Sequence, residues 1–233
     1  MKNQQNQELE AVKKEILDSF IKVNETFIGN VNSLHKLGTK SKKLEMAATS
    51  QILDTLNLKN KEVIYTSGLC EANNLALYGL LEHYTNKDKK IIATETCETS
   101  VLETLKSLEK EEFEIEIVNN FDNLNLNNTI LVCFSSYEEY SYFISKYKDY
   151  SNHILLDITK EIPLDKSLEK IDFLTFDLSK YDLYGIGVLI KSTNVIIEPL
   201  FKGGKSTTIY RSGTPALPLI TIFSKYLRQL YKK

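Results

Sequence analysis

Two charged residues follow strand-like runs, where α/β proteins place many of their binding and catalytic groups. Lys180 lies in TFDLSKYDLYGIG, between two such runs. A lysine there could form a Schiff base with an aldehyde cofactor if its ammonium pKa is lowered. Asp157 ends the run HILLD, and its carboxylate could accept a hydrogen bond from a protonated ring nitrogen. Each also has an ordinary interpretation, Lys180 as a solvated lysine and Asp157 as a helix cap or loop residue.

Two glycine-containing segments could bind an anion. In TSGLCEANN, Ser67 and Gly68 precede a helix expected to open near Glu71, and free N–H groups at a helix start can hold a phosphate. An ordinary strand-to-helix turn would look the same. The second segment, FKGGKSTTIYRSGT, is either a glycine-rich loop or a set of anion contacts: Gly203, Gly204, Arg211, Gly213 and Thr214.

These residues need a scaffold, and the hydrophobic pattern supplies one. An amphipathic helix is expected over about 7–23, a turn-rich polar stretch over 29–43, and a final helix after Pro218. Between them strand-like runs alternate with helical ones. Strands are expected at 62–67, 90–94, 113–118, 129–134, 153–157, 171–176 and 185–190, and helices at 43–57, 71–84, 101–110 and 137–148. This alternation predicts one α/β domain over 1–233, with a mostly parallel sheet covered by helices on both faces.

Composition excludes several classes of protein. The 233 residues carry 29 basic and 31 acidic side chains, a net charge of −2, which argues against nucleic-acid binding through bulk charge. No apolar run is long enough for a membrane span, and the polar start MKNQQNQELEAVKKE lacks a signal-peptide core. A cytoplasmic protein with no membrane or nucleic-acid partner is expected.

The cysteines and histidines do not predict a metal site. Cys70, Cys97 and Cys133 are far apart and form no CxxC pair, and the three histidines show no paired spacing. A sulfur- or iron-handling scaffold built on the three cysteines is the weakest interpretation, because their spacing suits no cluster.

The order of several motifs resembles that of the NifS/IscS cysteine desulfurases, which have the class V aminotransferase fold. The resemblance covers about residues 29–218. It rests on GNVNSLHKLG, EVIYTSGLCEANNLALYG, LLDITKEIPLD, DLSKYDLYGIGVL and EPLFKGG…RSGT. It implies a large domain of PLP-dependent transferase fold type I and pyridoxal 5′-phosphate as cofactor.

The resemblance also implies roles for individual residues. Lys180 matches the lysine that carries the internal aldimine, and Asp157 matches the aspartate that pairs with the pyridine nitrogen. Thr214 matches the RSGT threonine that reaches the phosphate of a partner subunit's cofactor, which implies a homodimer. Gly68, Cys70 and Ser179 occupy further cofactor-contact positions.

Other positions depart from the family pattern. Cys70 replaces a phosphate-binding threonine, Glu98 the histidine that stacks on the ring, and Lys160 a glutamine. Asp177 and Ser179 replace a serine and a histidine. The small C-terminal domain, with the family's nucleophilic cysteine and substrate-binding arginine, is expected to be absent.

Two functions remain open. The first is a cysteine desulfurase-like protein that binds pyridoxal phosphate through Lys180 and transfers sulfur from L-cysteine, with the thiol supplied by Cys70, Cys97 or another chain. The second is a catalytically inactive relative that binds a full-length desulfurase, as a heterodimer, or another sulfur-transfer protein.

Overall fold

The computed structural model describes residues 2–82, 84, 89–163, 166–204 and 206–231, with side chains from Val12 onward. These residues form two compact units, one of Met1–Asn57 with Gly203–Lys233 and one of Leu58–Lys202. The prediction of a single domain over 1–233 stays a prediction.

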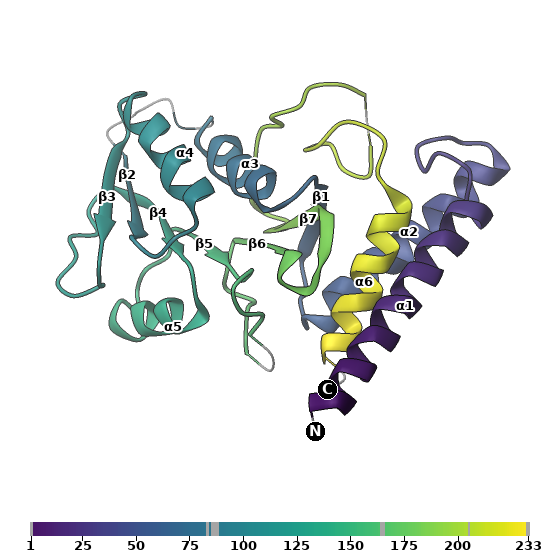
Figure 1. Ribbon diagram of the computed structural model, residues 1–233. Helices are drawn as coiled ribbons and strands as arrows, with labels where there is room; N and C mark the ends of the chain where they lie inside the picture. Colours follow the sequence, from purple (N-terminus) through teal and green to yellow (C-terminus); the bar gives the residue numbers. More distant parts are fainter. Residues whose placement is uncertain (1, 83, 85–88, 164–165, 205, 232–233) are drawn as a thin grey trace. The chain divides into compact units, whose positions relative to one another are not determined.

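The Leu58–Lys202 unit is built on a seven-stranded sheet with the order β1-β7-β6-β5-β4-β2-β3 (Figure 1). The strands β2 to β6 pair in parallel with one another, whereas β7 is antiparallel to both β1 and β6. The strands are β1 (Lys61–Thr66), β2 (Lys90–Thr94), β3 (Glu114–Val118), β4 (Thr129–Phe134), β5 (His153–Asp157), β6 (Phe173–Leu178) and β7 (Leu183–Ser192). The predicted mostly parallel sheet is confirmed.

The central strands are buried along nearly their whole length. Every residue of β4 and of β2 is buried, as are Ile154–Asp157 of β5, because helices pack against the sheet. The helices are α3 (Leu69–Leu81) and α4 (Thr99–Glu109) on one side of the sheet, and α5 (Tyr137–Lys146) on the other (Figure 1). A short 3-10 helix, η1 (Ser179–Tyr181), follows β6.

The other unit is helical. It contains α1 (Lys2–Thr26), α2 (Lys36–Thr55) and α6 (Leu217–Tyr231). Its small apolar core holds Val23, Val31 and Leu217. The Ser224 hydroxyl of α6 donates a hydrogen bond to the Gln51 side chain of α2 at 2.9 Å. The helix expected over 7–23 lies inside α1, although the side chain of Leu9 lies outside the described residues.

Several helices begin earlier than predicted, and α2 and α6 show why. Helix α2 begins at Lys36, inside the stretch expected to be turn-rich, because the His35 ring caps it by accepting a hydrogen bond from the Gly38 N–H at 3.2 Å. Gly38 is required there for packing rather than as a turn, since a Cβ would lie 2.2 Å from the Ser33 carbonyl oxygen. Helix α6 begins at Leu217, so Pro218 lies in its first turn, where the missing N–H costs no helical bond.

Among the described residues, no helix combines the length and the apolar character needed to cross a bilayer.

Candidate functional site

The sheet brings Asp157 and Lys180 to the same edge. Strands β5 and β6 are parallel neighbours with Asp157 opposite Thr175, and Lys180 follows β6 within η1. Carboxyl ends of parallel strands share one edge of a sheet, which is where α/β proteins bind ligands. The structure therefore places the two charged residues that the sequence singled out on one side of the unit.

Asp157 is a buried carboxylate at the end of β5, only 2% exposed. One oxygen, Oδ1, accepts a hydrogen bond from the Thr159 N–H at 2.9 Å, and Oδ2 accepts one from Asn73 Nδ2 at 3.2 Å. Burial raises the pKa of the carboxyl group, while these hydrogen bonds oppose the shift. No ion pair to Asp157 exists among the described residues. A buried carboxylate of this kind is suited to a cationic N–H donor that is not part of the described chain.

Asn73 is a site residue that the sequence analysis missed. It is fully buried on α3, and its Nδ2 donates to Asp157 and to the Ser100 hydroxyl at 2.9 Å. Its Oδ1 is buried and has no hydrogen-bond partner in the described part of the chain. Asn73 therefore fixes the orientation of the Asp157 carboxylate. An asparagine at an inward-facing position of an otherwise apolar helix was the available signal.

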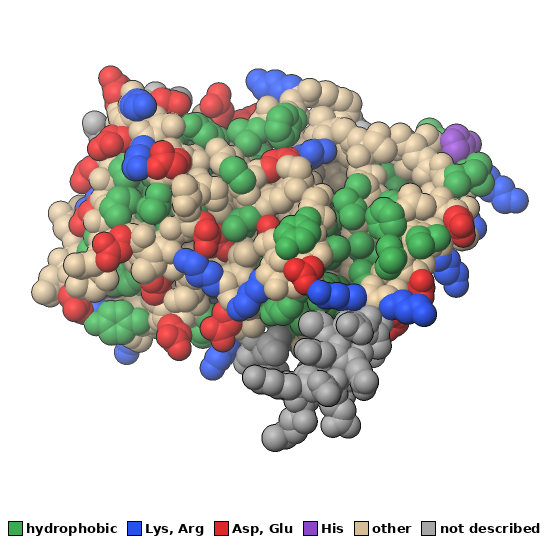
Figure 2. All heavy atoms as spheres, viewed as in Figure 1, with side chains coloured by type: hydrophobic (Ala, Val, Ile, Leu, Met, Phe, Trp, Pro, Cys, Tyr) green, Lys and Arg blue, Asp and Glu red, His purple; other side chains and the backbone are tan. Residues whose placement is uncertain are grey.

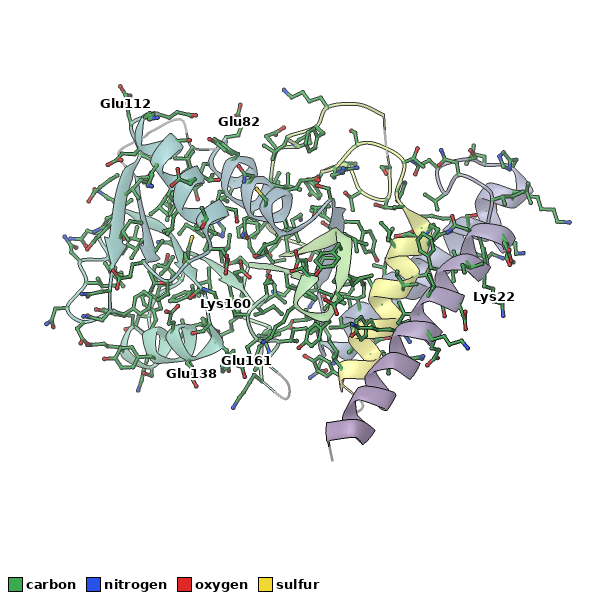
Figure 3. All side chains as sticks on the ribbon, viewed as in Figure 1. Lys22, Glu82, Glu112, Glu138, Lys160 and Glu161 are labelled. Atoms are coloured by element: carbon green, nitrogen blue, oxygen red, sulfur yellow. The ribbon has the colours of Figure 1, made fainter. Side chains whose placement is uncertain are left out.

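Lys180 is exposed, and its Nζ donates a hydrogen bond to the backbone carbonyl of Lys160 at 2.6 Å. Lys160, labelled in Figure 3, in turn uses its own Nζ to contact the Thr96 carbonyl at 2.8 Å and Glu98 Oε1 at 3.4 Å. The charge of Glu98 also contributes to the raised pKa of Asp157. Glu98 and Lys160, two of the departures from the family pattern, therefore form an ion pair close to Asp157.

Ser179 is engaged within its own turn. Its hydroxyl donates to Asp177 Oδ1 at 2.7 Å, and its N–H donates to the same oxygen at 3.0 Å. The carboxylate of Asp177 thus binds the backbone and the side chain of Ser179, the first residue of η1. The predicted role of Ser179 in holding a cofactor stays a prediction.

The turn between β1 and α3 leaves an open space. Helix α3 begins at Leu69, two residues earlier than expected, and a Cβ on Gly68 would meet no atom within 4 Å. Glycine is needed instead at Gly187 of β7, where a Cβ would lie 2.5 Å from the Gly68 carbonyl carbon. The strand backbone packs directly on the turn. The sequence pattern pointed to Gly68 as part of a possible phosphate site, but not to Gly187.

The three cysteines differ in their chemical environment. Cys70, at the start of α3, is exposed, whereas Cys97 and Cys133 are buried. Burial is the main cause that raises the pKa of Cys97 to about 11, and burial also raises the pKa of Cys133. At neutral pH only about one Cys97 side chain in 10⁴ is then a thiolate, the nucleophilic form. Of the two thiols considered as internal sulfur acceptors, the structure disfavours Cys97.

Thr214 belongs to the helical unit. Its Oγ1 accepts a hydrogen bond from Asn30 Nδ2 at 3.3 Å. Asn30 and Thr214 come from GNVNSLHKLG and RSGT, so the fold brings two of the resembling motifs together within this unit. Among the described residues, no group of three or more His, Cys, Asp or Glu side chains could hold a metal ion.

A mostly parallel sheet with an aspartate and a lysine at its carboxyl edge is the architecture of the large domain of PLP-dependent transferases of fold type I. The family description "Aminotransferase class-V" matches residues 11–131, just over half of the chain. The chain therefore belongs to the class-V aminotransferase family.

Its curated relatives include cysteine desulfurases. It is 29% identical over 230 residues to a mitochondrial cysteine desulfurase of Eremothecium gossypii, covering 88% of this chain and 47% of that protein. It is 30% identical over 230 residues to the cysteine desulfurase IscS of Buchnera aphidicola subsp. Acyrthosiphon pisum (strain 5A), covering 89% and 56%. The chain thus spans about half the length of the curated relatives it matches.

Solved structures agree on the fold. A NifS-like protein has a TM-score of 0.81 at 22% identity, covering 94% of this chain and 66% of its own. A structure described as SspA in complex with cysteine has a TM-score of 0.79 at 22% identity, covering 92% and 68%. The predicted fold class is confirmed.

Proposed function

We propose that this chain binds pyridoxal 5′-phosphate at the carboxyl edge of its sheet, with Lys180 as the point of covalent attachment. The observation that carries the proposal is the buried Asp157 carboxylate, which has no cationic partner in the described chain and lies on the strand next to the one that leads into Lys180. A protonated pyridine nitrogen supplies the missing charge. The open space above Gly68, at the start of α3, suits a phosphate group. The residues present therefore fit this cofactor.

Each residue would have a distinct task. Bound pyridoxal phosphate supplies an electron sink for bonds to the substrate's α-carbon. The carboxylate of Asp157 would hold the proton on the ring nitrogen, and Asn73 would keep that carboxylate oriented. The first turn of α3, from Leu69, would donate N–H groups to the phosphate.

We further propose L-cysteine as the substrate and a sulfur-acceptor protein as a partner. The support is the class of the curated relatives, and the fold neighbour described as being in complex with cysteine. Sulfur would pass to a thiolate from Cys70 or from another chain, since burial raises the pKa of Cys97 and disfavours its thiolate. Such a protein would serve sulfur metabolism and iron–sulfur cluster assembly in the cytoplasm.

The alternative is a catalytically inactive relative that binds a full-length desulfurase. Two observations favour it. The charge of Glu98, which is paired with Lys160, contributes to the raised pKa of Asp157, and burial raises the pKa of both buried cysteines. Pyridoxal phosphate would then be retained without sulfur transfer, or lost.

Both proposed functions involve a second chain, which is either another copy of this chain or a full-length desulfurase. The helical unit supports such a contact because it exposes large apolar side chains, some visible as hydrophobic surface in Figure 2. They are Leu17, Ile21, Ile28, Leu34, Leu37 and Met46, with Leu34 99% exposed. Sedimentation of Leu34→Asp beside the wild type tests the homodimer, which predicts dissociation of the variant.

The attachment is tested by reducing the protein with borohydride after incubation with pyridoxal phosphate, followed by peptide mass mapping. We expect the pyridoxyl group on Lys180 in the wild type and in the matched control Lys160→Ala, and none at this site in Lys180→Ala. Labelling spread over many surface lysines, unchanged in Lys180→Ala, would contradict the proposal.

A further inference from the structure

Strand β3 forms one edge of the sheet. It pairs with β2 alone, and no other described strand lies along its outer side (Figure 1). An edge strand presents a row of backbone N–H and C=O groups that can pair with another extended segment. In the described part of the chain these groups make no strand pairing.

A groove runs beside this edge, between β3 and helix α4. Its volume is about 330 Å³. The floor is apolar, formed by Leu102 and Leu105 of α4 with Ile115 and Ile117 of β3. Ile117 is 47% exposed, although it is a large aliphatic residue in a strand. A groove between an edge strand and a helix is the geometry in which peptide-recognition domains accept an added strand.

The surroundings of the groove are acidic. Glu95 and Glu109 lie at its rim and form no ion pair with any described residue. The basic rim residue, Lys106, is paired with Glu103 at 2.5 Å. The turn between α4 and β3 contains two glutamates and one lysine, and so adds one net negative charge. Its Glu112 points away from the protein in Figure 3.

The other face of β3 is acidic as well. Glu114 and Glu116 alternate with the two isoleucines and so lie on the opposite face of the strand. Lys90 contacts Glu116 at 3.0 Å and lies 4.0 Å from Glu114, whose side chain is 65% exposed. The single positive charge of Lys90 therefore faces the carboxylates of both Glu114 and Glu116, and one net negative charge remains at the edge of the sheet.

We propose that the β3 edge and its groove bind an extended segment of another protein in which apolar residues alternate with lysine or arginine. Alternate side chains of an added strand point to opposite faces. The apolar set would enter the groove over Ile115 and Ile117, and the basic set would lie beside Glu114 and Glu116. Pairing of two β3 strands would instead bring carboxylates against carboxylates, which is destabilising. The occupant is therefore a basic–apolar strand rather than a second copy of this edge.

The test is fluorescence anisotropy of the purified protein with a labelled octapeptide that alternates valine and lysine. We expect saturable binding that weakens with salt. A peptide of the same composition with its valines and lysines in two blocks should bind at least fivefold more weakly, and an alternating valine–glutamate peptide at least tenfold more weakly.

Two variants locate the site. Ile117→Asp should weaken binding at least tenfold, whereas the control Ile196→Asp, at a 65% exposed isoleucine outside the groove, should leave affinity unchanged. Reversing charge with Glu109→Lys and Glu114→Lys together should shift preference toward the valine–glutamate peptide. No saturable binding, equal affinity of the alternating and block peptides, or equal effects of the two isoleucine variants would overturn the proposal.

Discussion

The Asp157 carboxylate has no cationic partner among the described residues. It is buried at the end of β5, holds two hydrogen bonds from Asn73 and Thr159, and has a raised pKa because burial outweighs them. In the absence of a cationic ligand, keeping this group ionised lowers the stability of the folded protein. A group of this kind is typical of a binding site rather than of a structural core.

This leads to a pH prediction for Asp157→Asn without cofactor. The pKa of Asp157 is higher in the folded protein than in the unfolded one. Between these two pKa values the folded state keeps a proton that the unfolded state has lost, so the free energy of unfolding of the wild type falls as pH rises through this range. The free energy of unfolding of the variant, relative to wild type, should therefore increase from about pH 4 to pH 7. Urea titrations at both values measure it. A constant difference between the two proteins would contradict the prediction.

A second prediction at the level of single residues concerns the reactivity of the cysteines. A thiol reagent at neutral pH should modify Cys70 quickly, because it is exposed, and Cys97 and Cys133 only after unfolding, because burial keeps them as thiols. Cys70→Ser should remove the fast phase, and Cys97→Ser should leave it. A fast phase that survives in Cys70→Ser would show that a buried cysteine is reactive.

At the scale of elements, the contact between β7 and the start of α3 shapes the candidate phosphate site. The backbone of Gly187 packs against Gly68, while the space on the other side of Gly68 stays open. The helix start is thus held against the sheet without a side chain filling the site. Two neighbouring glycines therefore have different roles, one in packing and one in leaving room.

Alanine substitutions separate these roles. Gly187→Ala should lower the free energy of unfolding by about 1–3 kcal/mol or more, because its Cβ would overlap the Gly68 backbone. Gly68→Ala should change it little, since nothing lies within 4 Å of the added carbon and the backbone there is extended. Thermal and urea unfolding of both variants test this. Equal destabilisation by the two substitutions would contradict it.

The sequence predicted most elements of the sheet correctly. Strands β2, β4 and β5 have the predicted bounds, because each is a short apolar run ended by polar residues. The start of α2 was missed because residues 36–43 are mostly polar and carry no helical apolar repeat, and its cap is a histidine. The start of α6 was missed because Pro218 marks a first turn as well as a boundary.

At the scale of the whole molecule, the chain combines a helical unit with a sheet unit, and the class-V aminotransferase match over residues 11–131 covers part of each. The sequence located Asp157 and Lys180, because strand ends in an α/β pattern converge on one edge. It could not locate Asn73 or Gly187, whose importance depends on contacts between elements distant in sequence. The hydrophobic pattern of a sequence identifies residues at strand ends. Contacts between elements that are distant in sequence can be recognised only in the folded structure.

The proposal that Lys180 and Asp157 hold pyridoxal phosphate is tested most directly by an absorbance spectrum. The protein is purified with added cofactor, beside Lys180→Ala, and recorded before and after L-cysteine is added. We expect a visible band in the wild type that is lost in the variant, and a change of that band with L-cysteine if the chain is active. A visible band that does not respond to L-cysteine would favour the inactive relative. No visible band in the wild type would contradict the cofactor proposal.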